Sequence, residues 1–559
     1  MKSVFTPVRP VLCAFTALAM TGFPAHADTL VDNVAGMRFE RDGTVERFAA
    51  LLIDDDGRVA RLYREGERLP REVDYRLDGE GRVLMPSFVD AHLHVAGLGL
   101  ATLTLDLSDT NSLAEAQQRI AAYAADNPDR AWIIGRGWNQ ERWGLGRFPT
   151  AADLDAAVAD RPVWLERVDG HAGWANTAAM RAAGVDADTP DPDGGRIERI
   201  AGGKMPAGVF VDGASALIDK ARPSIRPEDR DRALQNAQDL LIARGITAVA
   251  DMGTTMQDWH TYRRAGDLGR LRIRIMSYAH GVEDMEAIAG PGPSPWLYRD
   301  RLHMGGVKLY LDGALGSRGA WLSQPYVDAP KQTGLPLLTG TQLRNLMSRA
   351  AMDDFQVAVH AIGDAANAEV LDAIAELDDT YTGERRWRIE HAQIVAPADI
   401  RRFAALGAVA SMQPQHQTSD RLMAEARLGP DRLDGAYAWA SMERAGVPVA
   451  FGSDAPVETP DVFAGLAAAI SRTDADGQPV GGWYPDETLM PAQALAAYTA
   501  TAAWAGRAEG RFGTLEKGEW ADFILLDQDP LTAAPERLRA MTVMETWIAG
   551  QRVYTADRD

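Results

Sequence analysis

The stretch Phe88-Val-Asp-Ala-His92-Leu-His94 decides how the rest of this chain is interpreted. It is a short apolar run that ends in two histidines spaced two residues apart. Because side chains two apart on a strand point to the same side, both imidazoles would face one way. Neutral imidazole is a good ligand for zinc and similar metals. A lone His-x-His pair is a weak signal, so the rest of the pattern must support it.

Four further apolar runs each carry or end in a residue with a metal-ligand type of side chain. They are Val307-Lys308-Leu-Tyr, Val357-Ala-Val-His360, Arg388-Ile-Glu-His391 and Val449-Ala-Phe-Gly-Ser-Asp454. In a (β/α)8 barrel the C-terminal ends of all strands open onto one face, where catalytic groups gather. The order His-x-His, Lys, His, His, Asp therefore predicts one metal centre. Its expected ligands are His92, His94, Lys308, His360, His391 and Asp454.

The middle of the chain predicts an α/β fold, a (β/α)8 TIM barrel over residues 85–507. Strand-like runs alternate there with helical patterns, which is typical of parallel βα units. The eight runs are residues 87–92, 246–252, 272–279, 305–311, 356–360, 387–391, 407–412 and 447–452. The first gap is much longer than the others. We therefore expect an insertion after strand 1, over about residues 100–240, beside the barrel mouth.

Both ends of the mature chain have the pattern of short strands joined by turns. Residues 28–84 include a predicted hairpin around Leu51-Leu-Ile-Asp-Asp-Asp-Gly. Residues 508–559 contain two similar strand-like runs. The two ends are therefore predicted to form one small β-sandwich.

The first 27 residues have the features of a signal peptide. A basic start is followed by an apolar run that is too short for a membrane anchor and by Ala25-His26-Ala27, a small-x-small cleavage site. We expect cleavage after Ala27 and export, to the periplasm. Cys13 is the single cysteine and lies in this segment, so the mature chain would contain no disulfide and no thiolate site.

Composition narrows the range of partners. The formal net charge of −21 disfavours nucleic acids and anionic membrane surfaces. The acidic residues are spread along the chain, as on a solvated acidic surface. We expect a small-molecule substrate as the partner, with no nucleic acid and no stable membrane anchor. Whether the chain forms a homo-oligomer is left open.

Lys308 is the least ordinary member of the predicted metal set, since an ammonium inside an apolar barrel strand is costly unless it is paired. One interpretation is a salt bridge to Asp312 or another inner acid. The other is that burial lowers the pKa of the amine. The neutral amine could then take up CO2, and the resulting carbamate could bridge two metal ions.

The other residues have structural alternatives too. His360 and His391 could be hydrogen-bonded core histidines, and Asp454 could cap a helix. His416, in Ser411-Met-Gln-Pro-Gln-His416, is a candidate to bind a substrate carbonyl or the developing oxyanion. The segment Asp169-Gly-His171-Ala-Gly-Trp174-Ala-Asn176 is a second-rank candidate. Four histidines fit no strand end and are predicted to be structural, surface or signal residues: His26, His260, His280 and His303.

These stretches together resemble the amidohydrolase superfamily, in the amidohydrolase family 3 branch that includes N-substituted formamide deformylases. The likeness also includes Val307-Lys-Leu-Tyr-Leu-Asp-Gly-Ala-Leu-Gly-Ser-Arg318 and Gly518-Glu-Trp-Ala-Asp-Phe-Ile-Leu-Leu-Asp527, and covers nearly the whole mature chain. It implies a distorted barrel with one or two divalent metals, usually Zn²⁺, and Lys308 as the bridging lysine. This chain departs from the family pattern at position 319, where it has Gly and the family is expected to have Thr.

The resemblance and the residues together predict metal-dependent hydrolysis of a non-peptide amide C–N bond. Asp454 and His416 are the predicted catalytic residues. Asp454 would take a proton from the attacking water and return it to the leaving nitrogen, and His416 would help to stabilise the oxyanion. The same site would suit lactone, carbamate or ester hydrolysis. An exported binding protein without catalytic activity is the third alternative.

Overall fold

Eight parallel strands form the barrel in the computed structural model, which describes residues 28–557. The strands are β8 (Phe88–Leu93), β15 (Ile246–Thr254), β16 (Arg274–His280), β17 (Leu302–Tyr310), β18 (Gln356–Ala361), β19 (Arg388–His391), β20 (Val409–Met412) and β21 (Val449–Phe451). Each coincides with a predicted run, so the predicted barrel is confirmed. Strands buried on both faces appear in a sequence as continuous apolar runs, which is why these could be recognised.

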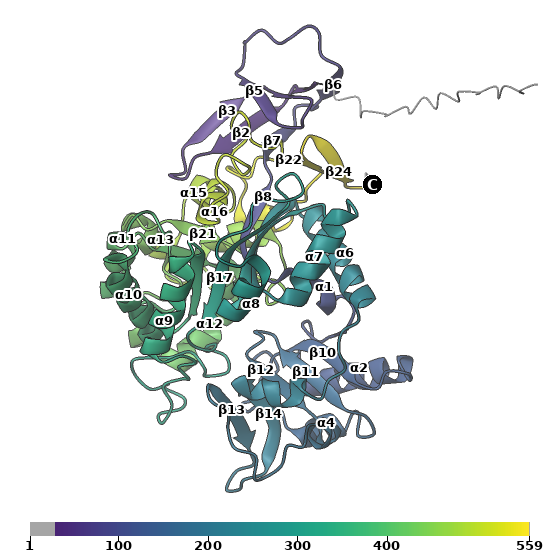
Figure 1. Cartoon of the computed structure of the whole chain (residues 1–559), viewed down its shortest axis with the longest axis vertical. Coiled ribbons are helices and arrows are strands. Elements are labelled where there is room, and N and C mark those ends of the chain that lie inside the picture. Colours follow the sequence, from purple (N-terminus) through teal and green to yellow (C-terminus); the bar gives the residue numbers. More distant parts are fainter. Residues whose placement is uncertain (1–27, 558–559) are drawn as a thin grey trace, which may run out of the picture.

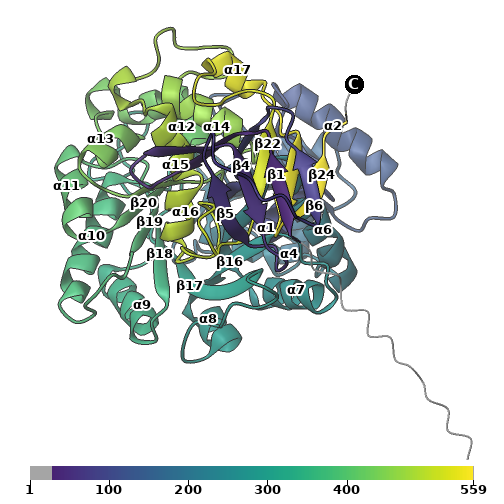
Figure 2. The same ribbon diagram turned by 90° about the horizontal axis from the view of Figure 1, so that it is seen from above.

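Helices surround the barrel and connect its strands (Figure 2). They are α1 (Val95–Ala101), α6 (Pro227–Ala243), α7 (Met256–Asp267), α8 (Gly281–Ala289), α9 (Gly340–Met352), α10 (Asp364–Asp378), α11 (Pro397–Ala405), α12 (Pro414–Leu428), α13 (Trp439–Arg444), α14 (Val462–Ser471), α15 (Pro491–Ala497) and α16 (Ala500–Ala505). Capping boxes begin α7 at Thr255 and α9 at Thr339. The apolar sides of the barrel helices pack on the strands in one large core.

The two ends of the described chain form one β-sandwich at the end of the barrel opposite the insertion (Figure 1). Its first sheet, in the order β5-β4-β1-β6, contains β5 (Val59–Tyr63), β4 (Ala50–Ile53), β1 (Thr29–Asp32) and β6 (Tyr75–Asp78). Its second sheet, in the order β24-β23-β22-β7-β2-β3, contains β24 (Gln551–Thr555), β23 (Glu545–Ile548), β22 (Phe523–Leu526), β7 (Val83–Pro86), β2 (Ala35–Phe39) and β3 (Val45–Phe48). The predicted sandwich of both termini is therefore confirmed. Helix α17 (Pro535–Arg539) lies between β22 and β23.

The sandwich is joined to the barrel by a buried ion pair. Arg274, at the start of β16, donates to the two carboxylate oxygens of Asp522 at 2.6 and 2.9 Å. Both side chains are inaccessible to solvent.

The insertion after β8 has its own sheet and core. Its six strands run in the order β13-β14-β12-β11-β10-β9. They are β9 (Leu105–Asp106), β10 (Ile133–Trp138), β11 (Val163–Arg167), β12 (Ala172–Ala175), β13 (Gly195–Arg199) and β14 (Pro206–Asp212), with α2 (Leu113–Asp126), α3 (Ala151–Asp155), α4 (Thr177–Ala183) and α5 (Ala216–Asp219). Trp138, Trp143 and Trp174 belong to its buried core.

The predicted signal peptide, residues 1–27, lies outside the described residues. Within residues 28–557, none of the helices has the length and apolar character needed to cross a bilayer.

Candidate metal centre at the barrel mouth

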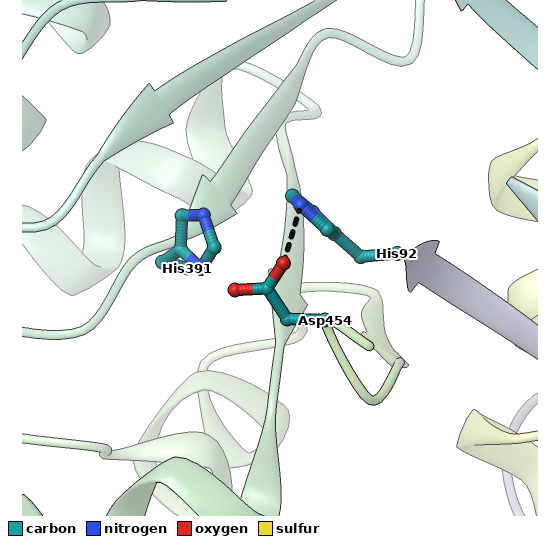
Figure 3. A group of neighbouring side chains, drawn as sticks. All are labelled: His92, His391 and Asp454. Atoms are coloured by element: carbon teal, nitrogen blue, oxygen red, sulfur yellow. Dashed lines mark ion pairs between the residues drawn. The ribbon is translucent and has the colours of Figure 1, made fainter. Parts of the chain in front are cut away.

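His92, His391 and Asp454 converge at the C-terminal ends of three strands (Figure 3). One potential ligand atom from each lies within 4.8 Å of the others. Nε2 of His92 is 3.5 Å from Oδ1 of Asp454. All three side chains are buried, and Oδ1 of Asp454 makes no hydrogen bond within the described chain. A buried carboxylate oxygen facing imidazole nitrogens without a hydrogen-bond donor is the arrangement that a divalent cation would satisfy.

The other three predicted ligands surround this cluster. Nε2 of His94 lies 3.1 Å from Oδ1 of Asp454, without the alignment of a hydrogen bond. Nζ of Lys308 lies 3.3 Å from Nε2 of His92. The ring of His360 is centred 4.6 Å from that of His391. All six residues are thus brought together at one face of the barrel; their roles as ligands stay a prediction.

A buried ion pair orients His92. Its Nδ1 lies 2.6 Å from Oε2 of Glu390, and Nε of Arg388 donates to Oε1 of the same carboxylate at 2.7 Å. Because a carboxylate accepts, Nδ1 carries the proton and Nε2 keeps its lone pair, which faces the site and Nζ of Lys308. Burial, with the nearby charge of Lys308, lowers the pKa of His92 to about 4, so the ring is neutral at pH 7.

Arg388 also fixes the surrounding strands. Its guanidinium, fully buried inside the barrel, donates to the carbonyl of Ala91, the hydroxyl of Ser411 and the hydroxyl of Tyr278 at 2.6, 3.0 and 3.1 Å. Neither Glu390 nor Arg388 is among the site residues predicted from the sequence. The sequence does show two charged residues spaced two apart in an apolar strand. This spacing puts both side chains on the same face of the strand, here the inner face of the barrel.

His391 and His360 are also held as neutral rings. Nδ1 of His391 lies 2.9 Å from Oε1 of Gln413, which leaves Nε2 free to face the centre. Burial is the main cause that holds the pKa of both His391 and His360 well below the usual value. Neutral imidazole is the form that binds metal.

Lys308 is not paired with Asp312. The Asp312 carboxylate instead accepts from the backbone amides of Trp321, Ile362 and Gly363 at 2.8, 3.0 and 2.9 Å. Among residues 28–557, no carboxylate lies within 4.0 Å of Nζ of Lys308. The Nζ atom lies 5.0 Å from the centre of the Tyr310 ring. Burial lowers the pKa of Lys308 to about 8. The structure thus removes the Asp312 salt bridge as the explanation of this lysine.

Asp90 joins the first and last barrel strands below the centre. Its Oδ1 accepts from the amides of His92 and Ser453, both at 3.0 Å. The amide of Asp454 donates to the carbonyl of His92 at 2.6 Å. Gly452 lets the strands approach, because a Cβ there would lie 2.4 Å from the amide nitrogen of His92. Asp454 has a φ of 57°, a conformation that is costly outside glycine and is held here by these bonds.

His416 faces the centre from the first turn of α12. Its Nε2 is buried, has no hydrogen-bond partner among the described residues, and lies 3.6 Å from Oδ2 of Asp454. A cavity of about 740 Å³ opens from this point between the barrel mouth and the insertion. His360, His391, His416 and Asp454 line its floor, and residues of the insertion line its other side.

His171, from the insertion, lies in the same cavity. Its Nδ1 is 2.7 Å from Oδ1 of Asp212, and its ring is centred 5.0 Å from that of His360. Burial lowers its pKa, but the hydrogen bond with Asp212 and the charges of Asp212, Asp169 and Asp312 together raise the pKa to about 9. The same pair explains why residue 319 is glycine, because a Cβ at this position would lie 2.6 Å from Oδ2 of Asp212.

One sequence interpretation needs correction. His280 was expected to fit no strand end, yet it is the last residue of β16 and pairs in register with Lys308. The predicted run ended one residue too early. The side chain is exposed and is not among the cavity residues, so it adds nothing to the centre. His303 stacks on Trp296 and His260 is exposed on α7, as expected; His26 lies outside the described residues.

Comparison with known proteins agrees with this geometry. The model of the family described as "Amidohydrolase family" matches residues 77–554. "Protein LONG AFTER FAR-RED 3" of Arabidopsis thaliana is 31% identical, covering 94% of this chain and 92% of that protein. "N-substituted formamide deformylase" of Arthrobacter pascens is 28% identical, covering 86% and 89%.

Solved structures show the same fold. An uncharacterized metal-dependent hydrolase from Pyrococcus horikoshii superimposes with a TM-score of 0.72 at 26% identity. The match covers 91% of this chain and 99% of that one. It therefore includes the barrel, the insertion and the terminal sandwich.

Proposed function

Because the chain belongs to the amidohydrolase family, we propose that it hydrolyses the C–N bond of a non-peptide amide at the barrel mouth. The observation that carries the proposal is the meeting of His92, His391 and Asp454 within 4.8 Å at the floor of a cavity. The similarity to a formamide deformylase favours an amide over other carbonyl substrates. A divalent metal, Zn²⁺ by the nature of the donors, would polarise the carbonyl and lower the pKa of water.

His92, His94, His391 and Asp454 would hold one ion, and His360 with Lys308 would complete a second position. Glu390 and Gln413 orient two of these imidazoles through their Nδ1 atoms. The ligand atoms come from strand ends, which are rigid elements of the barrel.

Asp454 is the proposed proton shuttle. Its Oδ1 faces His92 and His94, while Oδ2 faces His416 and the cavity. The carboxylate would accept a proton from the attacking water and deliver it to the leaving nitrogen. His416 Nε2, buried and unpartnered, would donate to the carbonyl oxygen as negative charge develops on it.

The proposal is tested by turnover of the zinc-loaded protein on formamides, N-acyl amines, lactones and carbamates. Release of amine from the amides, lost in Asp454→Asn while zinc is retained, supports it, because an amide oxygen can bind metal but cannot shuttle a proton at neutral pH. Lactone or carbamate hydrolysis without amide hydrolysis would instead favour the alternative reactions on the same site. Absence of zinc binding would favour a binding protein.

We also propose that Lys308 bears a carbamate when metal is bound. Its support is full burial, the absence of a carboxylate partner within the described chain and a position 3.3 Å from His92. Nuclear magnetic resonance of protein loaded in ¹³C-bicarbonate should show a carbamate signal that Lys308→Ala lacks. Short carboxylic acids should partly restore activity to that variant. The proposal fails if the two spectra are the same.

Export is proposed from residues 1–27 alone. N-terminal sequencing of protein from the periplasmic fraction should begin at Asp28.

A further inference from the structure

The cavity beside the metal centre contains charged side chains from both the barrel and the insertion. Most of the lining carboxylates already have partners within the protein. Asp169 pairs with Arg167, Glu141 with Arg427 and Asp109 with Arg119, while Asp420 accepts from Tyr437 and Glu458 from Ser419. Asp106 accepts from the amide of Ser108 at 2.9 Å, and Asp454 belongs to the proposed metal centre. Most negative charges of the cavity wall thus have a hydrogen-bond or ion-pair partner among the described residues.

Arg136 is different. It lies on β10, the strand of the insertion that ends beside the cavity, and lines it. Its guanidinium donates one hydrogen bond, from Nη2 to the carbonyl of Val168 at 3.1 Å. Among residues 28–557, no carboxylate lies within 4.0 Å of Arg136, and its Nε and Nη1 have no acceptor. A cation with spare donors therefore faces the space in which a substrate would lie.

Such an arrangement is costly unless an anion completes it. Burial lowers the pKa of Arg136, and the charges of Glu166, Asp106, Asp454 and Asp169 offset this effect only in part. The guanidinium is therefore half-buried without a close ion pair. Guanidinium presents its donors in a rigid fork that suits carboxylate oxygens. The two other cavity arginines without a carboxylate partner, Arg142 and Arg244, donate to the carbonyls of Ser108 and Leu240. Arg142 is exposed and lies in the loop after β10, whereas Arg136 is held on the strand.

We propose that the substrate is an anionic amide, whose carboxylate binds Arg136 while its carbonyl lies at the metal centre. The inference rests on the proposed amide hydrolysis and adds the charge of the substrate. The acyl C–N bond breaks, and water supplies the hydroxyl of the released acid and the proton of the released amine. The carboxylate is a spectator group that positions the amide, so Arg136 is a specificity residue.

The test compares matched pairs that differ only in charge. One pair places the carboxylate on the amine side: N-acetylphenylalanine and N-acetylphenylalaninamide. The other places it on the acyl side: N-phenylsuccinamic acid and its primary amide. Dissociation constants are measured by calorimetry on the zinc-loaded full chain, and turnover is followed separately by the amine released.

In the wild type the acid of at least one pair should bind about 10- to 100-fold more tightly than its amide, the range expected for hydrogen bonds to a charged group. Arg136→Gln should remove this preference and Arg136→Lys should retain part of it. Arg226→Gln is the matched control, because Arg226 is exposed, pairs with Asp229 and does not line the cavity. It should keep the full preference.

The inference is overturned if neither acid is preferred by the wild type, or if the preference persists in Arg136→Gln. Hydrolysis of both members of a pair at equal rates and affinities would leave amide hydrolysis standing and refute the charge assignment. Binding of an acid that depends on Arg136, with no amine released from any amide, would support the charge assignment and refute amide hydrolysis. Thermal unfolding of each variant shows that the comparison is made on folded protein.

Discussion

Glu390 Oε2 and His92 Nδ1 lie 2.6 Å apart, and neither side chain is accessible to solvent. The two residues come from strands β19 and β8, which are not neighbours in the barrel sheet. Arg388 holds the other oxygen of the carboxylate. The pair therefore sets the orientation of His92 from across the barrel.

Glu390→Gln should weaken zinc binding by about 10- to 100-fold, the usual effect of losing an outer partner of a metal-binding histidine. An amide can turn its NH2 group towards Nδ1, which would favour the wrong tautomer. A chelator competition titration measures the change. Glu384→Gln is the control, since Glu384 is an exposed partner of Arg386. Unchanged zinc affinity in Glu390→Gln would show that the pair does not orient the ligand.

Gly452→Ala should destabilise the protein by about 1–3 kcal/mol, because overpacking at a close backbone contact forces a shift. The added Cβ would meet the amide nitrogen of His92 at 2.4 Å and Oδ1 of Asp90 at 2.7 Å. Denaturant unfolding gives the free energy. At Gly292 the nearest atom would be 3.8 Å away, so Gly292→Ala should be close to neutral. Similar losses in both variants would refute the steric argument.

Lys308→Met should stabilise the metal-free protein at pH 7. Burial lowers the pKa of Lys308 from 10.5 to about 8, so the folded state binds the proton less tightly than the unfolded state. The penalty is fully present below pH 8 and disappears as pH rises towards 10.5, and it amounts to about 3 kcal/mol. Unfolding free energies at pH 7 and pH 10 measure it. A difference between wild type and variant that does not shrink with pH would contradict the assignment.

The barrel and the six converging residues could be predicted because both depend on local patterns. A buried parallel strand is a continuous apolar run, and its last residue faces the barrel mouth. The pairing of Glu390 with His92 could not be predicted in this way, since it joins residues 298 positions apart. His171 and Asp212 meet through the fold of the insertion, where Asp212 adopts a φ of 48°. Nor can a sequence show that Arg136 lacks a carboxylate partner, because that depends on every neighbouring side chain.

The zinc dissociation constant of His92→Ala tests the central claim most directly, because His92 lies in the middle of the proposed ligand set. We expect affinity to fall by more than the roughly 100-fold that loss of an outer partner causes, since a direct ligand is removed. His260→Ala, on the exposed side of α7, should bind zinc as the wild type does. Equal zinc affinity in His92→Ala, His260→Ala and the wild type would contradict a metal centre at the barrel mouth.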